Sequence, residues 1–199
     1  MSPLFLLILA ASFLIGAIPF AKVAMIGTGI DITKVGSKNP GFNNVRRVVG
    51  WPRAAIPLVG DIAKGYLAIL LFSFSTAEPV LLWAIGIAAI LGHCWSPFLK
   101  WNGGKGVATM VGVLLKMEWQ ITLPCLVLYP SLRWFGRKMG WKQEGAISSI
   151  TTMFVISTLI LILRGRSEGA MAFVMFGIVV IRHIPNLKEI FVSVRKISL

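Results

Sequence analysis

A glycine-rich loop, WNGGKGVAT at residues 101–109, lies between two strongly apolar segments. Glycines let backbone N–H groups approach an anion closely, and Lys105 adds a compact positive charge. If a helix begins at Val107, its first N–H groups and its dipole favour the same anion. The spacing is not that of the nucleotide-binding G-x-x-x-x-G-K-[ST] loop. The pattern predicts a phosphate-binding loop; the alternative is a membrane turn whose lysine reaches to the headgroups.

A second polar stretch, DITKVGSKNPGFNNVRR at residues 31–47, contains glycines and a proline that interrupt a regular helix. The Asn-Pro-Gly sequence within it predicts a tight turn. Arg46 and Arg47 follow at the expected start of a helix, and a guanidinium can hold phosphate through two parallel hydrogen bonds. The short polar side chains that accompany them are Ser37, Asn39, Asn43 and Asn44. A second anion-binding loop and an ordinary solvated loop with basic residues both fit this stretch.

A third candidate, RHIPN at residues 182–186, lies near the end of the last apolar segment. His183 and Asn186 are three residues apart, so a helix-end turn would direct both at one polar ligand. The alternative is that His183 only caps a helix end. Asp61 and Lys64 line the same predicted cavity or neutralise each other within an apolar segment.

The residue types that are missing narrow the chemistry further. The chain has two histidines, and its two cysteines, Cys94 and Cys125, lack any motif spacing. We therefore expect buried thiols, no metal site, no cofactor and no acid–base carboxylate pair. A site rich in anion binders and poor in nucleophiles suits transfer from an activated, phosphate-bearing donor, with catalysis by positioning and electrostatics.

The composition shows whether the helices that must position these residues lie in water or in lipid. Of the 199 residues, 56% are hydrophobic and 14% are charged, against about 25% charged in a typical soluble domain. The excess apolar surface must face lipid, which predicts an all-α integral membrane protein that is embedded in the lipid bilayer. The net charge of +13 does not indicate nucleic-acid binding, because the basic residues lie mainly in short connections between apolar segments.

Hydropathy divides the chain into seven apolar segments, which predict about seven transmembrane helices in a single polytopic domain, 1–199. The fourth segment is short for a span, so a half-helix and a five-span fold with a re-entrant piece remain alternatives. We find no internal repeat. The segments lie at about 3–26, 53–75, 79–99, 105–117, 119–135, 146–164 and 169–187.

The basic residues predict the orientation of the chain. With seven spans, one membrane face receives fifteen Lys and Arg residues, from 27–53, 99–106, 132–145 and 182–199. The opposite face receives three, Lys116, Arg164 and Arg166. The positive-inside rule therefore predicts an amino terminus outside and a cytoplasmic carboxyl terminus. All three polar stretches then lie at the cytoplasmic face.

Three motifs, GSKNPGFNNVRR, GHCWSPFLKWNGGKGVAT and HIPN, resemble in sequence and order the bacterial acyl-phosphate:glycerol-3-phosphate acyltransferase family (PlsY). The flanking GAIPF and DIAKG sequences also fit. The resemblance implies a seven-span enzyme of the bacterial inner membrane with its site at the cytoplasmic face. Such an enzyme moves a fatty acyl group from acyl phosphate to the 1-hydroxyl of glycerol 3-phosphate, giving lysophosphatidic acid and phosphate without a covalent acyl-enzyme.

The resemblance also implies roles for residues at the matching positions. Those expected to hold glycerol 3-phosphate are Ser37, Arg47, Lys105, His183 and Asn186. Those expected to bind the acyl phosphate are Gly103, Gly104, Gly106, Val107, Ala108 and Thr109, with Asn44 nearby. The same substrate-binding set includes Gly36, Asn39 and His93.

Four positions differ from the usual family pattern. Lys38 stands where the family has glycine, Phe42 where it has alanine, Asn43 where it has threonine, and Arg195 where it has glutamate. Two alternatives therefore stand beside the acyltransferase: a diverged paralogue with another donor or acceptor or no activity, and a small organic-phosphate transporter. Transporters commonly contain paired repeats, and the absence of a repeat favours the enzyme. The sequence leaves the oligomeric state open.

Overall fold

The structure, a computed structural model, describes residues 2–75 and 78–195, with side chains described up to residue 192. Within these ranges every regular element is a helix, which confirms the predicted all-α class. The elements are α1 (Pro3–Ala17), α2 (Phe20–Val23), α3 (Phe42–Val49), α4 (Ala55–Phe72), α5 (Pro79–Cys94), the short 3-10 helix η1 (Pro97–Leu99), α6 (Val107–Met117), α7 (Trp119–Cys125), α8 (Leu128–Lys138), α9 (Glu144–Arg164) and α10 (Arg166–Arg195). The side chain of Arg195 lies outside the described residues.

Five of the described helical stretches are long and apolar enough to cross a membrane. They are Pro3–Val23, Ala55–Phe72, Pro79–Leu99, Glu144–Arg164 and Arg166–Val192. The two remaining predicted segments are shorter: α6 has 11 residues, and 119–135 is divided between α7 and α8. The total of about seven spans stays a prediction.

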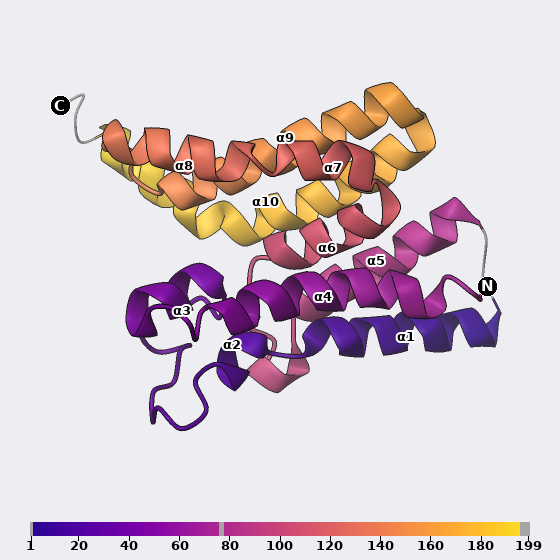
Figure 1. Ribbon diagram of the computed structural model, residues 1–199, viewed down its shortest axis with the longest axis horizontal. Coiled ribbons are helices and arrows are strands. Elements are labelled where there is room, and N and C mark those ends of the chain that lie inside the picture. The colour runs from indigo at the N-terminus through magenta and orange to yellow at the C-terminus, as the bar shows by residue number, and fades with distance from the viewer. Residues whose placement is uncertain (1, 76–77, 196–199) are drawn as a thin grey trace. The chain divides into compact units, whose positions relative to one another are not determined.

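The described helices pack as two compact units, residues 1–117 and 118–199, and the predicted single domain is not tested by this division. In the first unit α1 packs on α5 and α4 packs on α6 (Figure 1). Small residues permit the close approach: a Cβ added at Gly16 would lie 1.9 Å from the Ala89 carbonyl oxygen, and one at Gly112 would lie 1.9 Å from that of Ile62. Such glycine contacts are typical of membrane helix pairs, since lipid provides no hydrophobic driving force between helices.

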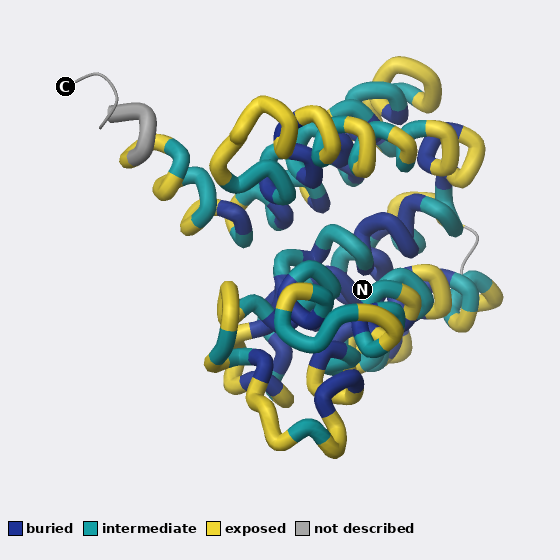
Figure 2. The backbone as a smooth tube through the Cα atoms, turned by 60° about the vertical axis from the view of Figure 1, so that its left-hand side comes forward, coloured by how far each residue is buried: buried dark blue, intermediate teal, exposed yellow. Residues whose placement is uncertain are grey.

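At one end of this unit, α2, α3 and the segment between them form a polar cap over a small apolar cluster. Figure 2 shows much of this segment exposed. Phe42, the first residue of α3, packs against the cluster, and its ring centroid lies 5.4 Å from that of Trp51. The extra bulk of Phe42 is therefore used in packing. The fully buried members of the cluster are Ala21, Ala24, Met25, Ile32, Val45 and Ala54.

In the second unit α9 packs against both α8 and α10. Arg164 Nε lies 2.8 Å from Glu118 Oε2 and ties the end of α9 to the residue that precedes α7. The sequence predicted that the last apolar segment ends near residue 187 and that HIPN forms a helix-end turn. That prediction was wrong, because α10 continues through Pro185 to Arg195. Membrane helices tolerate proline where neighbouring groups satisfy the freed carbonyl.

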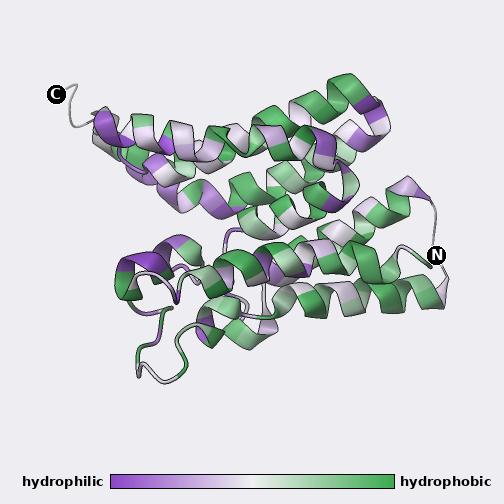
Figure 3. Cartoon of the chain, in the orientation of Figure 1, coloured by the Kyte–Doolittle hydropathy of each residue, from purple (hydrophilic) through white to green (hydrophobic). Residues whose placement is uncertain are grey.

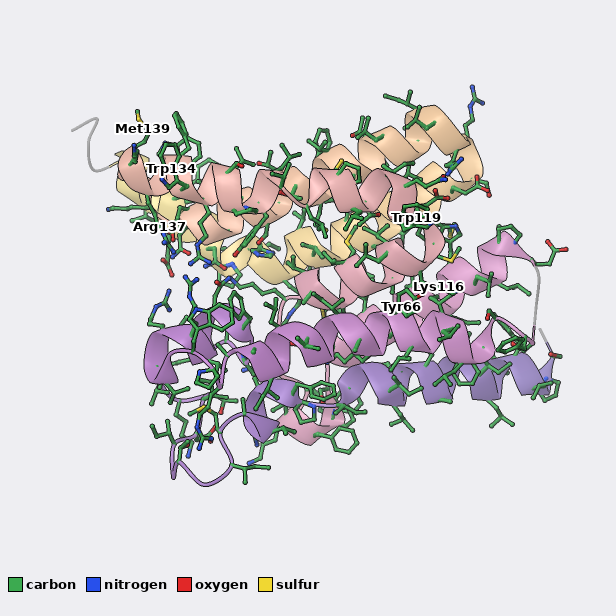
Figure 4. The ribbon with its side chains drawn as sticks, viewed as in Figure 1. Tyr66, Lys116, Trp119, Trp134, Arg137 and Met139 are labelled. Carbon is green, nitrogen blue, oxygen red and sulfur yellow. The ribbon has the colours of Figure 1, made fainter. Side chains whose placement is uncertain are left out.

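The end of α8 has a mixed surface. Figure 3 shows hydrophilic residues interspersed among hydrophobic ones along this helix. Trp134 is 60% exposed, and Lys138 Nζ lies 4.1 Å from the centroid of its ring. Figure 4 shows Trp134, Arg137 and Met139 together at this end. Exposed tryptophan beside basic residues is typical of a membrane–water interface.

Candidate functional site

The glycine loop is bonded to the end of α5. The N–H of Gly103 donates to the Cys94 carbonyl at 3.1 Å, and the N–H of Gly104 donates to the His93 carbonyl at 3.1 Å. These bonds satisfy helix-end carbonyls that have no partner within α5. Both N–H groups are therefore used within the protein, and backbone binding of an anion is left to residues after Gly104.

Each glycine of the loop occupies a position where a larger side chain would clash or strain the backbone. A Cβ at Gly103 would lie 2.0 Å from the His93 carbonyl oxygen, and one at Gly104 would lie 2.2 Å from His93 Nε2. Gly106 has φ +82°, a conformation that L side chains rarely adopt. Two glycines thus allow close packing on His93, and the third turns the chain into α6.

Lys105 and the start of α6 lie directly after this fixed segment. Lys105 is half-buried, and α6 begins at Val107. The first bond of the helix runs from the N–H of Met110 to the carbonyl of Gly106 at 2.8 Å. The N–H groups of Val107, Ala108 and Thr109 precede that bond, so the helix itself provides them no acceptor. The loop and helix together supply a cation and an N-terminal dipole, which suit a phosphate group.

Thr109 lies where α6 meets α4. It is fully buried, and its backbone oxygen would be 2.1 Å from a Cβ at Gly65. Its Oγ1 has no hydrogen-bond partner among the described residues. The close backbone contact fixes the first turn of α6 against α4.

Asn44 organises the second polar stretch. Its Oδ1 accepts from the N–H of Ser37 at 2.9 Å, and its Nδ2 donates to the carbonyls of Ile32 and Val35 at 3.1 and 3.0 Å. A Cβ at Gly36 would lie 2.3 Å from that Oδ1, and Gly36 has φ +59°. Asn44 therefore holds its own loop together and positions Ser37. The sequence predicts Asn44 near the acyl phosphate and does not indicate this structural role.

The remaining polar residues of this stretch lie nearer to solvent. Ser37 and Arg47 are exposed, and Asn39 is half-buried. Lys38, at the family's glycine position, has φ 57°. Hydrogen bonds from the hydroxyl and the N–H of Thr33 hold the pKa of Asp31 below its usual value. This loop thus offers a hydroxyl and a guanidinium that an incoming polar substrate can reach.

A buried ionic cluster lies beneath the glycine loop. Lys64 Nζ is 2.8 Å from Asp61 Oδ1, which confirms the predicted neutralisation within α4. His93 Nδ1 lies 3.5 Å from the same oxygen, a contact that the sequence analysis missed. The cluster and Gly104 border a small, partly open space of about 10 Å³, about enough for one water molecule. No local pattern indicates this contact, because residues 61 and 93 belong to different helices.

A larger hollow of about 320 Å³ lies between Lys22 and Ile32. None of the candidate site residues borders it.

His183 and Asn186 belong to the second unit, within α10 rather than at its end. His183 is buried, and its Nδ1 lies 2.8 Å from the Val179 carbonyl oxygen. Asn186 Nδ2 donates to Gln143 Oε1 at 2.6 Å, and Gln143 Nε2 donates to Glu189 Oε2. Sequence reasoning missed Gln143, whose φ of 60° before α9 has no sequence signal.

Together, the apolar helices and the loop that presents Lys105 at the start of α6 describe an integral membrane protein with a candidate anion-binding site. The chain matches the family model described as glycerol-3-phosphate acyltransferase over residues 6–193, and it belongs to that family. The resemblance inferred from the motifs is thereby confirmed.

Relatives named glycerol-3-phosphate acyltransferase align along most of the chain. The Sulfurimonas denitrificans protein is 34% identical over 189 residues, covering 91% of this chain and 90% of the relative. The Aromatoleum aromaticum protein is 35% identical over 190 residues, covering 94% and 92%. Glycerol-3-phosphate acyltransferase 1 of Deinococcus radiodurans is 36% identical over 186 residues, covering 93% and 91%.

The fold is similar to crystal structures of PlsY, described as an integral membrane glycerol 3-phosphate acyltransferase. The glycerol 3-phosphate form superposes with a TM-score of 0.84 at 26% identity, covering 95% of this chain and 92% of that chain. The lysophosphatidic acid form gives a TM-score of 0.82 with the same identity and coverage.

Proposed function

We propose that this chain transfers a fatty acyl group from acyl phosphate to the 1-hydroxyl of glycerol 3-phosphate, releasing lysophosphatidic acid and inorganic phosphate. The observation that carries the proposal is the fixed glycine loop, which presents Lys105 and the first turn of α6 in a chain of this family. A cation beside a helix N-terminus favours a phosphate group both before and after transfer.

The chemical step needs no group beyond the substrates and the protein. The 1-hydroxyl oxygen attacks the acyl carbonyl carbon, the bond from that carbon to the phosphate oxygen breaks, and the departing phosphate accepts the hydroxyl proton. The N–H groups of Val107 to Thr109 stabilise the negative charge on the departing phosphate, and Lys105 holds the phosphate of glycerol 3-phosphate. The protein therefore acts by orientation and electrostatics.

We propose that glycerol 3-phosphate binds through side chains whose roles rest on different kinds of evidence. Ser37 and Arg47 are exposed near the polar cap, where a charged, water-soluble molecule can reach them. For His183 and Asn186 the acceptor role rests on the family resemblance alone. The proposal places this chemistry at the cytoplasmic face of the bacterial inner membrane, with the amino terminus outside, because fifteen of the counted basic residues lie on one predicted face.

Direct transfer, without an acyl-enzyme, is part of the proposal. Cys94 is fully buried, and Cys125 lies in the second unit at the end of α7. We expect Cys94→Ser and Cys125→Ser to retain turnover. Incubation with donor alone should leave no hydroxylamine-sensitive acyl group on the protein; such a group, lost in one of these variants, would establish the covalent route instead.

The decisive experiment mixes purified protein in lipid with palmitoyl phosphate and glycerol 3-phosphate. Inorganic phosphate and lysophosphatidic acid should appear in equal amounts, and both should require the acceptor. Well-folded protein without acceptor-dependent product would refute the proposal. Transport of glycerol 3-phosphate into sealed vesicles, measured in parallel, would then indicate a transporter.

A further inference from the structure

Asp61, Lys64 and His93 form a cluster of three ionisable side chains that are each at most 7% exposed. Asp61 Oδ1 is shared: Lys64 Nζ lies 2.8 Å from it and His93 Nδ1 lies 3.5 Å from it. A carboxylate on the Nδ1 side favours the ring tautomer with its proton on Nδ1. At this distance the contact is electrostatic, and the negative charge of Asp61 favours a ring orientation in which Nδ1 faces the carboxylate.

The cluster also joins three helices. Lys64 Nζ donates to the carbonyl of Ile18 at 2.8 Å, just past the end of α1. Asp61 and Lys64 are one turn apart on α4, and His93 lies in the last turn of α5. The ammonium group thus anchors the Asp61 carboxylate relative to the end of α1 as well as to its own helix.

The histidine is the link between this cluster and the glycine loop. Its carbonyl accepts the N–H of Gly104, and its Nε2 would lie 2.2 Å from a Cβ at that glycine. The loop is therefore held by the backbone of His93 and pressed against its ring. A displaced ring would move Gly104, and with it the adjacent Lys105 and the start of α6.

Fold stability alone gives a weak reason for a buried ion pair. Removing two charges from water costs about as much as their attraction returns, and apolar replacements of similar size are often neutral or stabilising. Membrane-embedded ionisable residues are correspondingly rare and are usually functional. The geometry of this pair supplies a function that an apolar pair would not, because the Asp61 carboxylate places a negative charge beside Nδ1 of the His93 ring.

We propose that Asp61 and Lys64 are positioning residues that hold His93, and through it the loop that carries Lys105, in the geometry that binds the phosphate groups of the substrates. This inference rests on the proposed function for its kinetic consequence. Its structural consequence, an ordered loop at Gly103 and Gly104, does not depend on that function.

The test uses the double variant Asp61→Asn/Lys64→Met, which removes both charges and leaves no unpaired ion. A matched control, Glu118→Gln/Arg164→Met, removes an ion pair within the second unit. Ser12→Ala removes a buried hydrogen bond to the Ile85 carbonyl within the first unit. Thermal unfolding, the steady-state constants for both substrates, and hydrogen exchange of the 101–110 segment are measured for each variant.

We expect the double variant to fold, to lose at least about tenfold in kcat/KM, and to exchange the Gly103 and Gly104 amides at least about tenfold faster. A displacement of roughly an ångström near the reacting groups reduces the rate about 100-fold, so a smaller displacement of the loop accounts for a loss of at least about tenfold. Both controls should keep wild-type values of kcat/KM and loop exchange. The single variants Asp61→Asn and Lys64→Met should each lose the loop protection as well, which would support the shared role of the pair.

Wild-type kinetics and wild-type loop exchange in the folded double variant would overturn the inference. If the double variant does not fold, Asp61→Glu serves instead, since it keeps the charge and displaces the carboxylate by one methylene. Unchanged exchange and kcat/KM in that variant would overturn the inference equally. Wild-type protein without acyl transfer would refute the proposed function, whereas faster loop exchange in the variants would still support the positioning role.

Discussion

Replacing Gly104 by alanine tests the packing of the loop on His93 most directly. The added Cβ would lie 2.2 Å from His93 Nε2, 2.9 Å from Cε1 and 3.1 Å from Cδ2. Ordinary contact begins at 3.4 Å, so the ring and the loop must separate by 3.4 − 2.2 = 1.2 Å. The ring cannot retreat freely, because Asp61 lies against its Nδ1 side.

The separation predicts the size of two effects. Overpacking of this kind destabilises a protein by about 1–3 kcal/mol. A displacement of about 1 Å at a catalytic group reduces the rate roughly 100-fold, which corresponds to about 2.7 kcal/mol in transition-state stabilisation. We therefore expect Gly104→Ala to lose about 100-fold in kcat/KM and to be destabilised by about 1–3 kcal/mol.

The assay measures kcat/KM with palmitoyl phosphate and glycerol 3-phosphate, together with thermal unfolding in the same lipid. Gly177→Ala is the matched control, since a Cβ there meets no atom within 4 Å. It should keep full activity, and alanine within a helix adds up to about 1 kcal/mol of stability over glycine.

A double-mutant cycle identifies the clashing partner. His93→Ala removes the ring, so Gly104→Ala added to that background should cost less than about threefold, far from its roughly 100-fold effect alone. An equal loss in both backgrounds would refute the reasoning, because the damage would then come from a cause other than the His93 ring.

Three further predictions follow from single contacts. Lys105→Gln should lower kcat/KM by about 10- to 150-fold, the equivalent of a charged hydrogen bond of about 1.5–3 kcal/mol. Lys100→Gln, at an exposed position before the same loop, should stay within about twofold of wild type. Similar losses in both variants would show that Lys105 has no special role. Asn44→Ala should lower the free energy of unfolding by about 3 kcal/mol, near 1 kcal/mol for each of its three hydrogen bonds. An unchanged free energy of unfolding in chemical denaturation would contradict the organising role of Asn44. Lys38→Gly should raise the free energy of unfolding by about 0.5 kcal/mol. The left-handed conformation costs a lysine about 1–2 kcal/mol, and the larger loss of chain entropy when glycine folds cancels part of the gain. A lower melting temperature would show that the lysine side chain stabilises the loop.

Much of the fold was predictable because lipid imposes simple rules. A span needs about 20 apolar residues, so hydropathy alone located the five long helices. Residues three apart on a helix are neighbours, so the Asp61–Lys64 pair followed from its spacing. Helix α6 begins at Val107, which is the helix start considered in the sequence analysis.

Helix ends and interruptions were less predictable. Proline 185 and the polar residues around it suggested an end, yet α10 continues to Arg195. The apolar segment 119–135 is divided between two helices, with Pro124 inside α7. Whether a proline ends, bends or merely interrupts a helix depends on the groups that satisfy the freed carbonyl, and those groups come from other parts of the fold.

The sequence by itself determined which chemistry is available: anion-binding loops, few nucleophiles and a membrane environment, set by residue types and local spacing. Only the tertiary structure decided how the loops are used. It showed that Gly103 and Gly104 donate to α5 and pack on His93, that Asn44 holds its own loop, and that Asp61 reaches the His93 ring. These contacts join residues that are 7 to 32 positions apart. Local patterns carry no information about them, because the path of the loops and the packing of the helices bring the partners together.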